Sequence, residues 1–315
     1  MKKIFISLFA AMLMTSCVDN LEDFNVDQKR ATNVPPETLY TGAVKELTDV
    51  ITTPDVNVNN YRFYVQHWTT TQYLDEPRYN MTTRLIPQNV WQALYRDVLA
   101  DLKESKRLIE ADELAEENKK NNQLAQIEIM EVYAWSVLVN TFGNVPYSQA
   151  LDSDNSLPSY DDAATIYNDI LTRLDAALNR IKTDYSGFED GDILYKGNME
   201  NWIKFGNSLK LKLAMVIADV SPGSLVEAAA PNVFTSNMDN GAFPYLNAPP
   251  NNNPVSEEIN SLFTSRQDYV AANTLVDAMN ELNDPRRSFY FTQVDGEFKG
   301  GKYGFSNSYS DFSTI

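Results

Sequence analysis

The chain has 315 residues and a formal net charge of −17, from 26 Lys and Arg against 43 Asp and Glu. Such a surface repels the phosphates of nucleic acids, so nucleic-acid binding is excluded as the main function. A hydrophobic content of 43% with 17 tyrosines favours a globular body with a sizeable core. One cysteine and one histidine are too few for a Cys/His zinc site or an internal disulfide.

The first 16 residues have the pattern of a secretion signal. Two lysines precede an apolar run over residues 4–14, which is shorter than the roughly 20 residues that a helix needs to cross a bilayer. The letters MTSC then place Cys17 as in a bacterial lipobox, although Met14 stands where Leu is usual. We therefore expect removal of residues 1–16 and acylation of Cys17, which anchors the protein to a membrane. The alternative is an ordinary buried cysteine.

An acidic cluster follows Cys17 and is made up of Asp19, Glu22 and Asp23. It resembles the surface-export signal of some Gram-negative lipoproteins, and it fits a solvated tether with incidental charge equally well. We interpret residues 17–35 as the lipidated cysteine and a flexible tether. This tether leads to a first helix with Pro36 and Glu37 in its early turn.

Apolar residues at helical spacing dominate residues 36–220. The long patterns cover residues 90–114, 123–147, 159–181 and 198–219, and shorter ones cover 37–51, 57–74 and 267–282. The second long helix is expected to stop at Gly143, with Pro146 beyond it, and the third to begin with a weak capping box from Ser159 to Asp162. The fourth carries three lysines that we expect on a solvated face, namely Lys204, Lys210 and Lys212.

Helices of this length, with no alternating strand pattern before about residue 285, predict an all-α fold. A tetratricopeptide-like helical array fits residues 36–220, although no clean repeat of about 34 residues is present. Residues 221–315 are rich in Asn, Pro, Ser and Gly and predict an irregular, loop-rich C-terminal part with a helix near residues 267–283. Gly296–Tyr303 resembles a phosphate-binding loop, but Tyr follows its lysine instead of Ser or Thr, so we reject that site.

The residue types that catalysis needs are scarce. His67 is the only histidine and stands beside Trp68 in an expected helix, where a packed or half-exposed structural role is more common than a catalytic one. Cys17 is committed to lipid. No EF-hand spacing occurs, although the many acids and asparagines leave a calcium site with oxygen ligands open. We expect no catalytic residue, no metal and no cofactor. A surface glycosidase that uses two of the 43 carboxylates is an alternative that no sequence feature supports.

Aromatic residues next to short polar side chains are the clearest candidates for ligand binding. An aromatic face covers the apolar side of a sugar ring, while amides and carboxylates bind its hydroxyls. The candidates are Tyr73, Tyr79, Trp68 and Tyr245. At helical spacing, Trp68 more commonly packs in a core together with Tyr61 and Tyr64. A purely structural helical adaptor, with all of its aromatics in the core, is therefore the competing interpretation.

Four segments together resemble the SusD/RagB family of surface lipoproteins, in its SusD-like branch. They cover residues 130–151, 167–181, 192–215 and 275–291. The most specific signals are Asp-Pro-Arg at residues 284–286 and Gly-Asn-x-x-x-Trp-x-x-Phe-x-x-Ser-Leu from Gly197 to Leu209. Any one segment is a weak signal, but four in family order after a lipobox make the resemblance specific.

The resemblance implies a lipid-anchored protein of the outer membrane that faces the exterior and has no catalytic activity. It implies capture of oligosaccharides, or of peptides in RagB-like relatives, and delivery to a SusC-like TonB-dependent transporter. Ligand-contacting residues vary within the family, so the resemblance selects none of them here. Because relatives continue well beyond the Asp-Pro-Arg segment, we expect a C-terminally truncated chain whose second half begins within residues 221–315.

Overall fold

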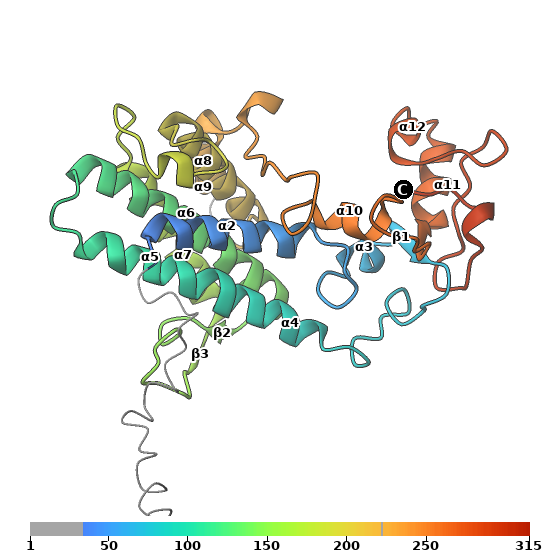
Figure 1. Cartoon of the computed structure of the whole chain (residues 1–315), viewed down its shortest axis with the longest axis horizontal. Helices are drawn as coiled ribbons and strands as arrows, with labels where there is room; N and C mark the ends of the chain where they lie inside the picture. The colour runs from blue at the N-terminus through green and yellow to red at the C-terminus, as the bar shows by residue number, and fades with distance from the viewer. Residues whose placement is uncertain (1–33, 222) are drawn as a thin grey trace, which may run out of the picture. The chain divides into compact units, whose positions relative to one another are not determined.

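The computed structural model describes residues 34–221 and 223–315 (Figure 1). The expected signal peptide, the acylation site Cys17 and nearly all of the tether lie outside these residues. The fold is all-α and tetratricopeptide-like, as predicted, with only short strands. No helix in the described residues is both long enough and apolar enough to span a membrane.

The main helices follow one another as a layered array. They are α2 (Pro36–Thr52), α4 (Ile86–Gln92), η2 (Ala93–Leu99), α5 (Ala100–Ala111), α6 (Glu117–Phe142), α7 (Ala163–Arg180) and α8 (Met199–Val216). α4, η2 and α5 form one continuous helix with a π-helical middle. α2 packs against η2 and α5, α5 against α6, α6 against α7, and α7 against α8 (Figure 1). Each amphipathic helix thus buries its apolar face against a neighbour.

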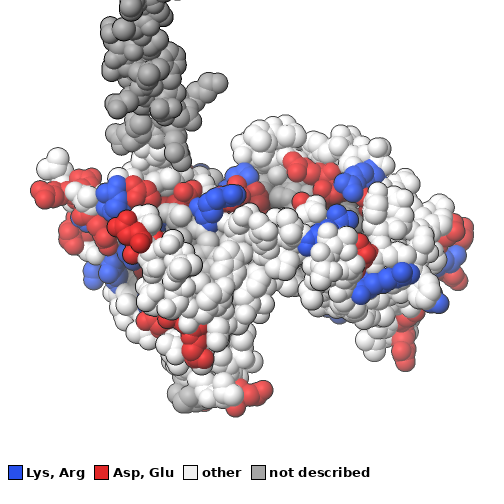
Figure 2. All heavy atoms as spheres, turned by 90° about the horizontal axis from the view of Figure 1, so that it is seen from below, with Lys and Arg blue, Asp and Glu red and all other residues white. Residues whose placement is uncertain are grey.

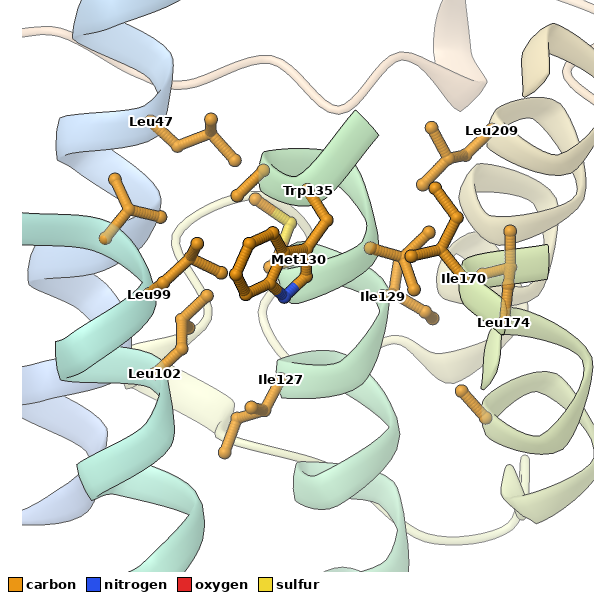
Figure 3. Packing of buried hydrophobic residues seen from close by; sticks show 14 of the residues in the cluster. Leu47, Leu99, Leu102, Ile127, Ile129, Met130, Trp135, Ile170, Leu174 and Leu209 are labelled. Carbon is orange, nitrogen blue, oxygen red and sulfur yellow. The ribbon is translucent and has the colours of Figure 1, made fainter. Parts of the chain in front are cut away.

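The hydrophobic core lies on both sides of α6 (Figure 3). On one side are Leu47, Leu99, Leu102, Ile127, Met130 and Trp135, and on the other are Ile129, Ile170, Leu174 and Leu209. The two sides come from different partners, with α2, η2 and α5 on the first and α7 and α8 on the second. α6 is therefore buried on opposite faces, which explains why its apolar residues are not confined to a narrow stripe.

The helix ends follow mostly from local sequence. Pro36 stands in the first turn of α2, as predicted. α6 ends at Gly143, whose φ of 75° is a left-handed conformation that glycine adopts without steric cost. The capping box predicted at Ser159 is wrong, because Asp162 caps α7 and accepts a hydrogen bond from the amide of Thr165 at 3.0 Å. The chain just before this cap is extended and pairs as a strand.

The side chain of Asp192 binds Gly197, which precedes α8, and Trp202, which lies within it. Its carboxylate is buried, and Oδ2 accepts from Trp202 Nε1 at 2.7 Å, from the amide of Gly197 at 2.9 Å and from Gln126 Nε2 at 3.0 Å. Two further backbone amides donate to Oδ1. Gly197 has φ 79°, which turns the chain back toward Asp192. Asn198 then caps α8, so the motif ties the start of this helix to α6.

Two short antiparallel ladders accompany the helices. β1 (Trp68–Thr70) pairs with β4 (Tyr269–Ala271), and Trp68 lies opposite Ala271. β2 (Val145–Pro146) pairs with β3 (Tyr160–Asp161). The first ladder joins the segment before α4 to the C-terminal part of the chain, which brings two distant loop regions side by side.

Two predicted helices are shorter than expected. Over residues 57–74 only α3 (Tyr61–Tyr64) is helical, and the prediction for the remainder is wrong. Gln66 there adopts φ 58°, which ends the helix, and the β-branched threonines after Trp68 favour a strand. The helix near residues 267–283 is confirmed as α11 (Asn273–Glu281), but the residues just before it form β4.

Residues 221–315 are irregular and loop-rich, as predicted. Their other short helical elements are α9 (Ser224–Ala229), η4 (Ala230–Asn232), η5 (Asn237–Asp239), α10 (Pro254–Ile259), α12 (Arg287–Tyr290) and η6 (Tyr309–Asp311). One more short element, η3 (Glu189–Gly191), lies outside this part of the chain, just before α8. α10 contacts α2. The domain boundary expected near residue 220 stays a prediction.

The solvated face predicted for the lysines of α8 is wrong for Lys210. This residue is buried, and its Nζ lies 2.5 Å from Asp175 of α7. Lys212 is exposed, as predicted, and its Nζ lies 4.9 Å from the ring centroid of Tyr133 in α6. At Lys210, α8 therefore packs against a neighbour beyond its apolar stripe.

Candidate ligand-binding site

The four aromatic residues predicted to bind ligand do not meet at one place. Tyr79 is 48% exposed and belongs to a row of tyrosines, whereas Tyr73 is 49% exposed and lines a separate cavity. Trp68 is only 9% exposed and packs in a small aromatic core cluster, so it presents no open ring face to a sugar. Tyr245 is half-buried, and its hydroxyl donates to Asp49 Oδ1 at 2.6 Å.

Four tyrosines form a continuous row, called the tyrosine row below: Tyr61, Tyr64, Tyr79 and Tyr303. Neighbouring ring centroids along this row are 6.4, 5.8 and 6.2 Å apart. Tyr64 and Tyr79 are stacked with an interplanar angle of 29°. These separations are typical of interacting aromatic pairs. α3 supplies two of the rings, and two loops from distant parts of the chain supply the others.

Backbone geometry places these rings side by side. Tyr61 and Tyr64 are three residues apart in α3 and therefore lie on one face of this short helix. Tyr79 has φ 59°, a left-handed conformation that costs a non-glycine residue on the order of 1–3 kcal/mol. Arg78 Nε donates to the carbonyl of Gly304 at 2.9 Å. This bond holds the loop of Tyr79 against the loop that carries the fourth ring.

The exposed hydroxyls of the tyrosine row are held by short polar side chains. The hydroxyl of Tyr61 shares a hydrogen bond with Thr141 Oγ1 at 2.8 Å. The hydroxyl of Tyr79 accepts from Gln66 Nε2 at 3.0 Å. These contacts fix the orientation of the two most exposed rings of the row, so the faces that solvent reaches are preorganised.

The tyrosine row is uncharged at neutral pH. Burial raises the pKa of Tyr64 and of Tyr303, while hydrogen bonds from Gln66 and Tyr303 lower the pKa of Tyr79 from its ordinary value of about 10. On the face drawn in Figure 2, charged side chains gather in separate groups, and broad areas carry neither sign. A neutral aromatic strip suits the apolar face of a sugar better than a charged ligand.

A cavity of about 340 Å³, called the Tyr61 cavity below, adjoins the row. Its lining residues are Val50, Ile51, Val58, Asn59, Tyr61, Val90, Tyr133, Val137, Asn140, Thr141 and Lys212. Five of them are aliphatic and two are tyrosines, and the others are two amides, one threonine and one lysine; none is Asp or Glu. An apolar hollow with few polar groups is the usual form of a small-molecule site.

The cavity beside Tyr73 differs in chemistry. It has a volume of about 290 Å³ and is lined by Arg84, Arg266, Asp268 and Glu258 among others. Arg266 Nε lies 2.6 Å from Asp268 Oδ2, so much of the charge is already paired within the protein. Burial raises the pKa of Glu258. The role predicted for Tyr73 is therefore separate from that of Tyr79.

The described residues hold few groups for catalysis. His67 is exposed in the bend before β1, and Cys17 lies outside these residues. Among residues 34–221 and 223–315, no three His, Cys, Asp or Glu side chains are arranged to hold a metal ion. Gly296–Tyr303 runs through turns and bridges and is followed by a turn, not by a helix that could bind phosphate at its N-terminus.

Several residues of the site were not predicted. Tyr61 was assigned to the core, yet it is 46% exposed. Tyr303 and Lys212 were not identified as candidates at all. The pair Asn59–Asn60 directly before Tyr61 is a turn signal that could have predicted a short helix with open faces. No local signal predicts the contact of Tyr303, because it depends on a loop distant in sequence.

With this geometry in view, comparison with known proteins identifies the family. A family model described as starch-binding and associating with the outer membrane matches residues 28–315. The chain belongs to this SusD-like family. This SusD-like assignment confirms the resemblance seen in the four sequence segments. No protein of curated function matches the SusD-like chain in sequence.

Solved structures share the fold of this SusD-like chain. A chitin-binding protein aligns with a TM-score of 0.74 at 23% identity, over 89% of this chain and 64% of its own. A SusD/RagB family protein from Bacteroides thetaiotaomicron aligns with a TM-score of 0.73 at 22% identity, over 90% of this chain and 62% of its own. A chitin-binding SusD homologue from Flavobacterium johnsoniae aligns with a TM-score of 0.68 at 24% identity, over 88% of this chain and 60% of its own. These likenesses establish the fold, and the chain spans less than two thirds of each structure's length.

Proposed function

We propose that this SusD-like protein is a non-catalytic lipoprotein that captures oligosaccharides at the outer membrane. The observation that carries the proposal is the tyrosine row, with two rings about half exposed and the Tyr61 cavity beside them. Stacking on such rings binds sugars through their apolar faces, and nearby amides and hydroxyls bind sugar hydroxyls. The family description and the chitin-binding proteins that share the fold support this ligand class.

The proposal includes the anchor and the next step of uptake. Acylation of Cys17 would hold the protein at the membrane, facing the exterior, and a SusC-like TonB-dependent transporter would receive the captured ligand. Metabolic labelling with a fatty-acid probe tests the anchor, since the parent protein should be labelled and a Cys17→Ala variant should not. Co-purification with a TonB-dependent transporter from detergent-solubilised outer membranes tests the partnership, and elution of the protein alone would contradict it.

Isothermal titration calorimetry tests the ligand class. The protein without residues 1–17 is titrated with maltooligosaccharides, chitooligosaccharides and a set of short peptides. We expect binding of an oligosaccharide and a loss of roughly thirtyfold in affinity for Tyr79→Ala, because truncating a central binding aromatic costs about 2 kcal/mol.

The matched control is Tyr185→Ala, since Tyr185 is similarly exposed, at 44%, but lies outside the row. Its affinity should equal that of the parent protein. Binding of peptides with no response to any oligosaccharide would favour the RagB-like alternative and refute glycan capture. Release of reducing sugar by the purified protein would instead contradict the absence of catalysis.

A further inference from the structure

Lys212 is the one lining residue of the Tyr61 cavity that carries a charge. It lies at the exposed rim, and its Nζ stands 4.9 Å from the ring centroid of Tyr133. No carboxylate of the described residues lies within ion-pairing distance of it, although this chain has 43 Asp and Glu. The ring face attracts the ammonium group but leaves its three N–H donors free to bind a ligand.

In two other cavities with charged lining residues, the cation is paired with a carboxylate. In the cavity beside Tyr73, Arg266 is paired with Asp268. In a larger cavity of about 800 Å³ beside α5, Lys106 Nζ lies 2.9 Å from Glu128 Oε2. On α8 itself, Lys210 is paired with Asp175, and Lys204 is paired with Asp239. In contrast to these two cavities, the cavity that adjoins the tyrosine row presents a cation with no acid in its lining.

A second donor faces the same cavity. Asn140 accepts a hydrogen bond at Oδ1 from the hydroxyl of Tyr167 at 3.3 Å, which orients its Nδ2 as a donor with no partner among the described residues. Partial burial lowers the pKa of Lys212, because the ammonium loses water without gaining a carboxylate. A ligand carboxylate would supply the missing charge and accept from both donors, whereas a neutral sugar would not.

We infer that the Tyr61 cavity binds the carboxylate of an acidic sugar residue, with Lys212 as its ion-pair partner and Asn140 as a second donor. The inference rests on the proposed function, since the remaining sugars of the same glycan would lie on the tyrosine row. The ligand class is therefore an oligosaccharide that contains uronic acid. The volume of about 340 Å³ lies within the range of about 300–1,000 Å³ that is usual for small-ligand sites.

The test compares each acidic oligosaccharide with its own methyl ester, which keeps the backbone and removes the charge. Oligogalacturonate, oligoglucuronate and oligomannuronate are titrated as acid and as ester against the parent protein. At least one acid should bind tenfold or more tightly than its ester. Raising the salt concentration from 20 to 500 mM should reduce this ratio, since an ion pair at an exposed rim is screened.

Variants identify the residue responsible. Lys212→Met should bring the acid and its ester within about twofold of each other, mainly by weakening the binding of the acid. Lys103→Met is the matched control and should keep the full ratio, because Lys103 is a lysine on α5 that lines a different cavity. Lys212→Gln gives a second, independent variant, and unfolding midpoints establish that each protein is folded.

The possible outcomes separate the two proposals. An acid-to-ester ratio near one for all three pairs, together with binding of neutral oligosaccharides at the row, overturns the acidic-sugar inference and leaves glycan capture intact. Failure to bind any acidic or neutral oligosaccharide overturns the proposed function itself. Lys212-dependent binding of acidic peptides without binding of sugars assigns the carboxylate to a peptide and likewise overturns the inference.

Discussion

Replacement of Asp192 by Asn tests how the start of α8 is held to α6. The carboxylate is buried and accepts five N–H groups, three at Oδ2 and two at Oδ1. Asn has nearly the same shape but replaces one acceptor oxygen by an NH₂ group. Asp192→Asn therefore changes hydrogen bonding with almost no change in packing volume.

The magnitude follows from the number of donors that lose their acceptor. If the Asn oxygen keeps the three donors at Oδ2, its NH₂ faces the amides of Leu194 and Tyr195, which both donate to Oδ1 at 3.1 Å. Each buried donor left unpaired costs about 1–3 kcal/mol. The free energy of unfolding should thus fall by about 2–6 kcal/mol, a large part of the roughly 5–15 kcal/mol that is usual for a folded protein.

Urea unfolding followed by tryptophan fluorescence and circular dichroism measures this loss. The control is Asp190→Asn, which changes an exposed carboxylate in the adjoining turn and should alter stability by less than about 0.5 kcal/mol. If Asp192→Asn unfolds at the same urea concentration as the parent protein, the carboxylate does not organise this region, and the reasoning is refuted.

Two further predictions concern the C-terminal part. Gly300→Ala should lower the melting temperature by about 3 °C or more, because its Cβ would lie 2.3 Å from Asn273 Cα, whereas Gly223→Ala meets no atom within 4 Å and should have little effect. Hydrogen bonds from Arg286 lower the pKa of Asp284 to about 2, so the stabilisation is present above the ordinary value of about 4 and is lost as the pH falls toward 2. The difference in melting temperature between the parent protein and Asp284→Asn should therefore be largest near neutral pH and should shrink as the pH falls from about 4 to about 2. A difference that persists in full at pH 2 would contradict this prediction.

The helical scaffold was predictable because its determinants are local. Apolar residues at helical spacing predicted α2, α6, α7 and α8, and Gly143 marked the end of α6. The pairing of β1 with β4 was not predictable, since Trp68 and Ala271 are far apart in sequence and each strand has only three residues. The burial of Lys210 was missed for the same reason, because its partner Asp175 lies on another helix.

The candidate site was predictable only in part. Tyr79 was identified from its polar, proline-containing loop, and its exposure agrees with that interpretation. Trp68 was named from composition but is buried by its strand pairing. Tyr303 joins the row through the hydrogen bond between Arg78 and Gly304, which links two loops that no sequence pattern connects. The ligand role of these residues stays a prediction. Tertiary contacts, which the sequence does not reveal, decide which of the aromatic residues meet.

A crystal structure with the tightest oligosaccharide from the titrations shows directly whether the tyrosine row binds glycan. We expect a sugar ring stacked on the exposed face of Tyr79 or Tyr61, with the chain of sugars following the tyrosine row toward the Tyr61 cavity. A glycan bound elsewhere, with the faces of both rings left in solvent, would contradict it.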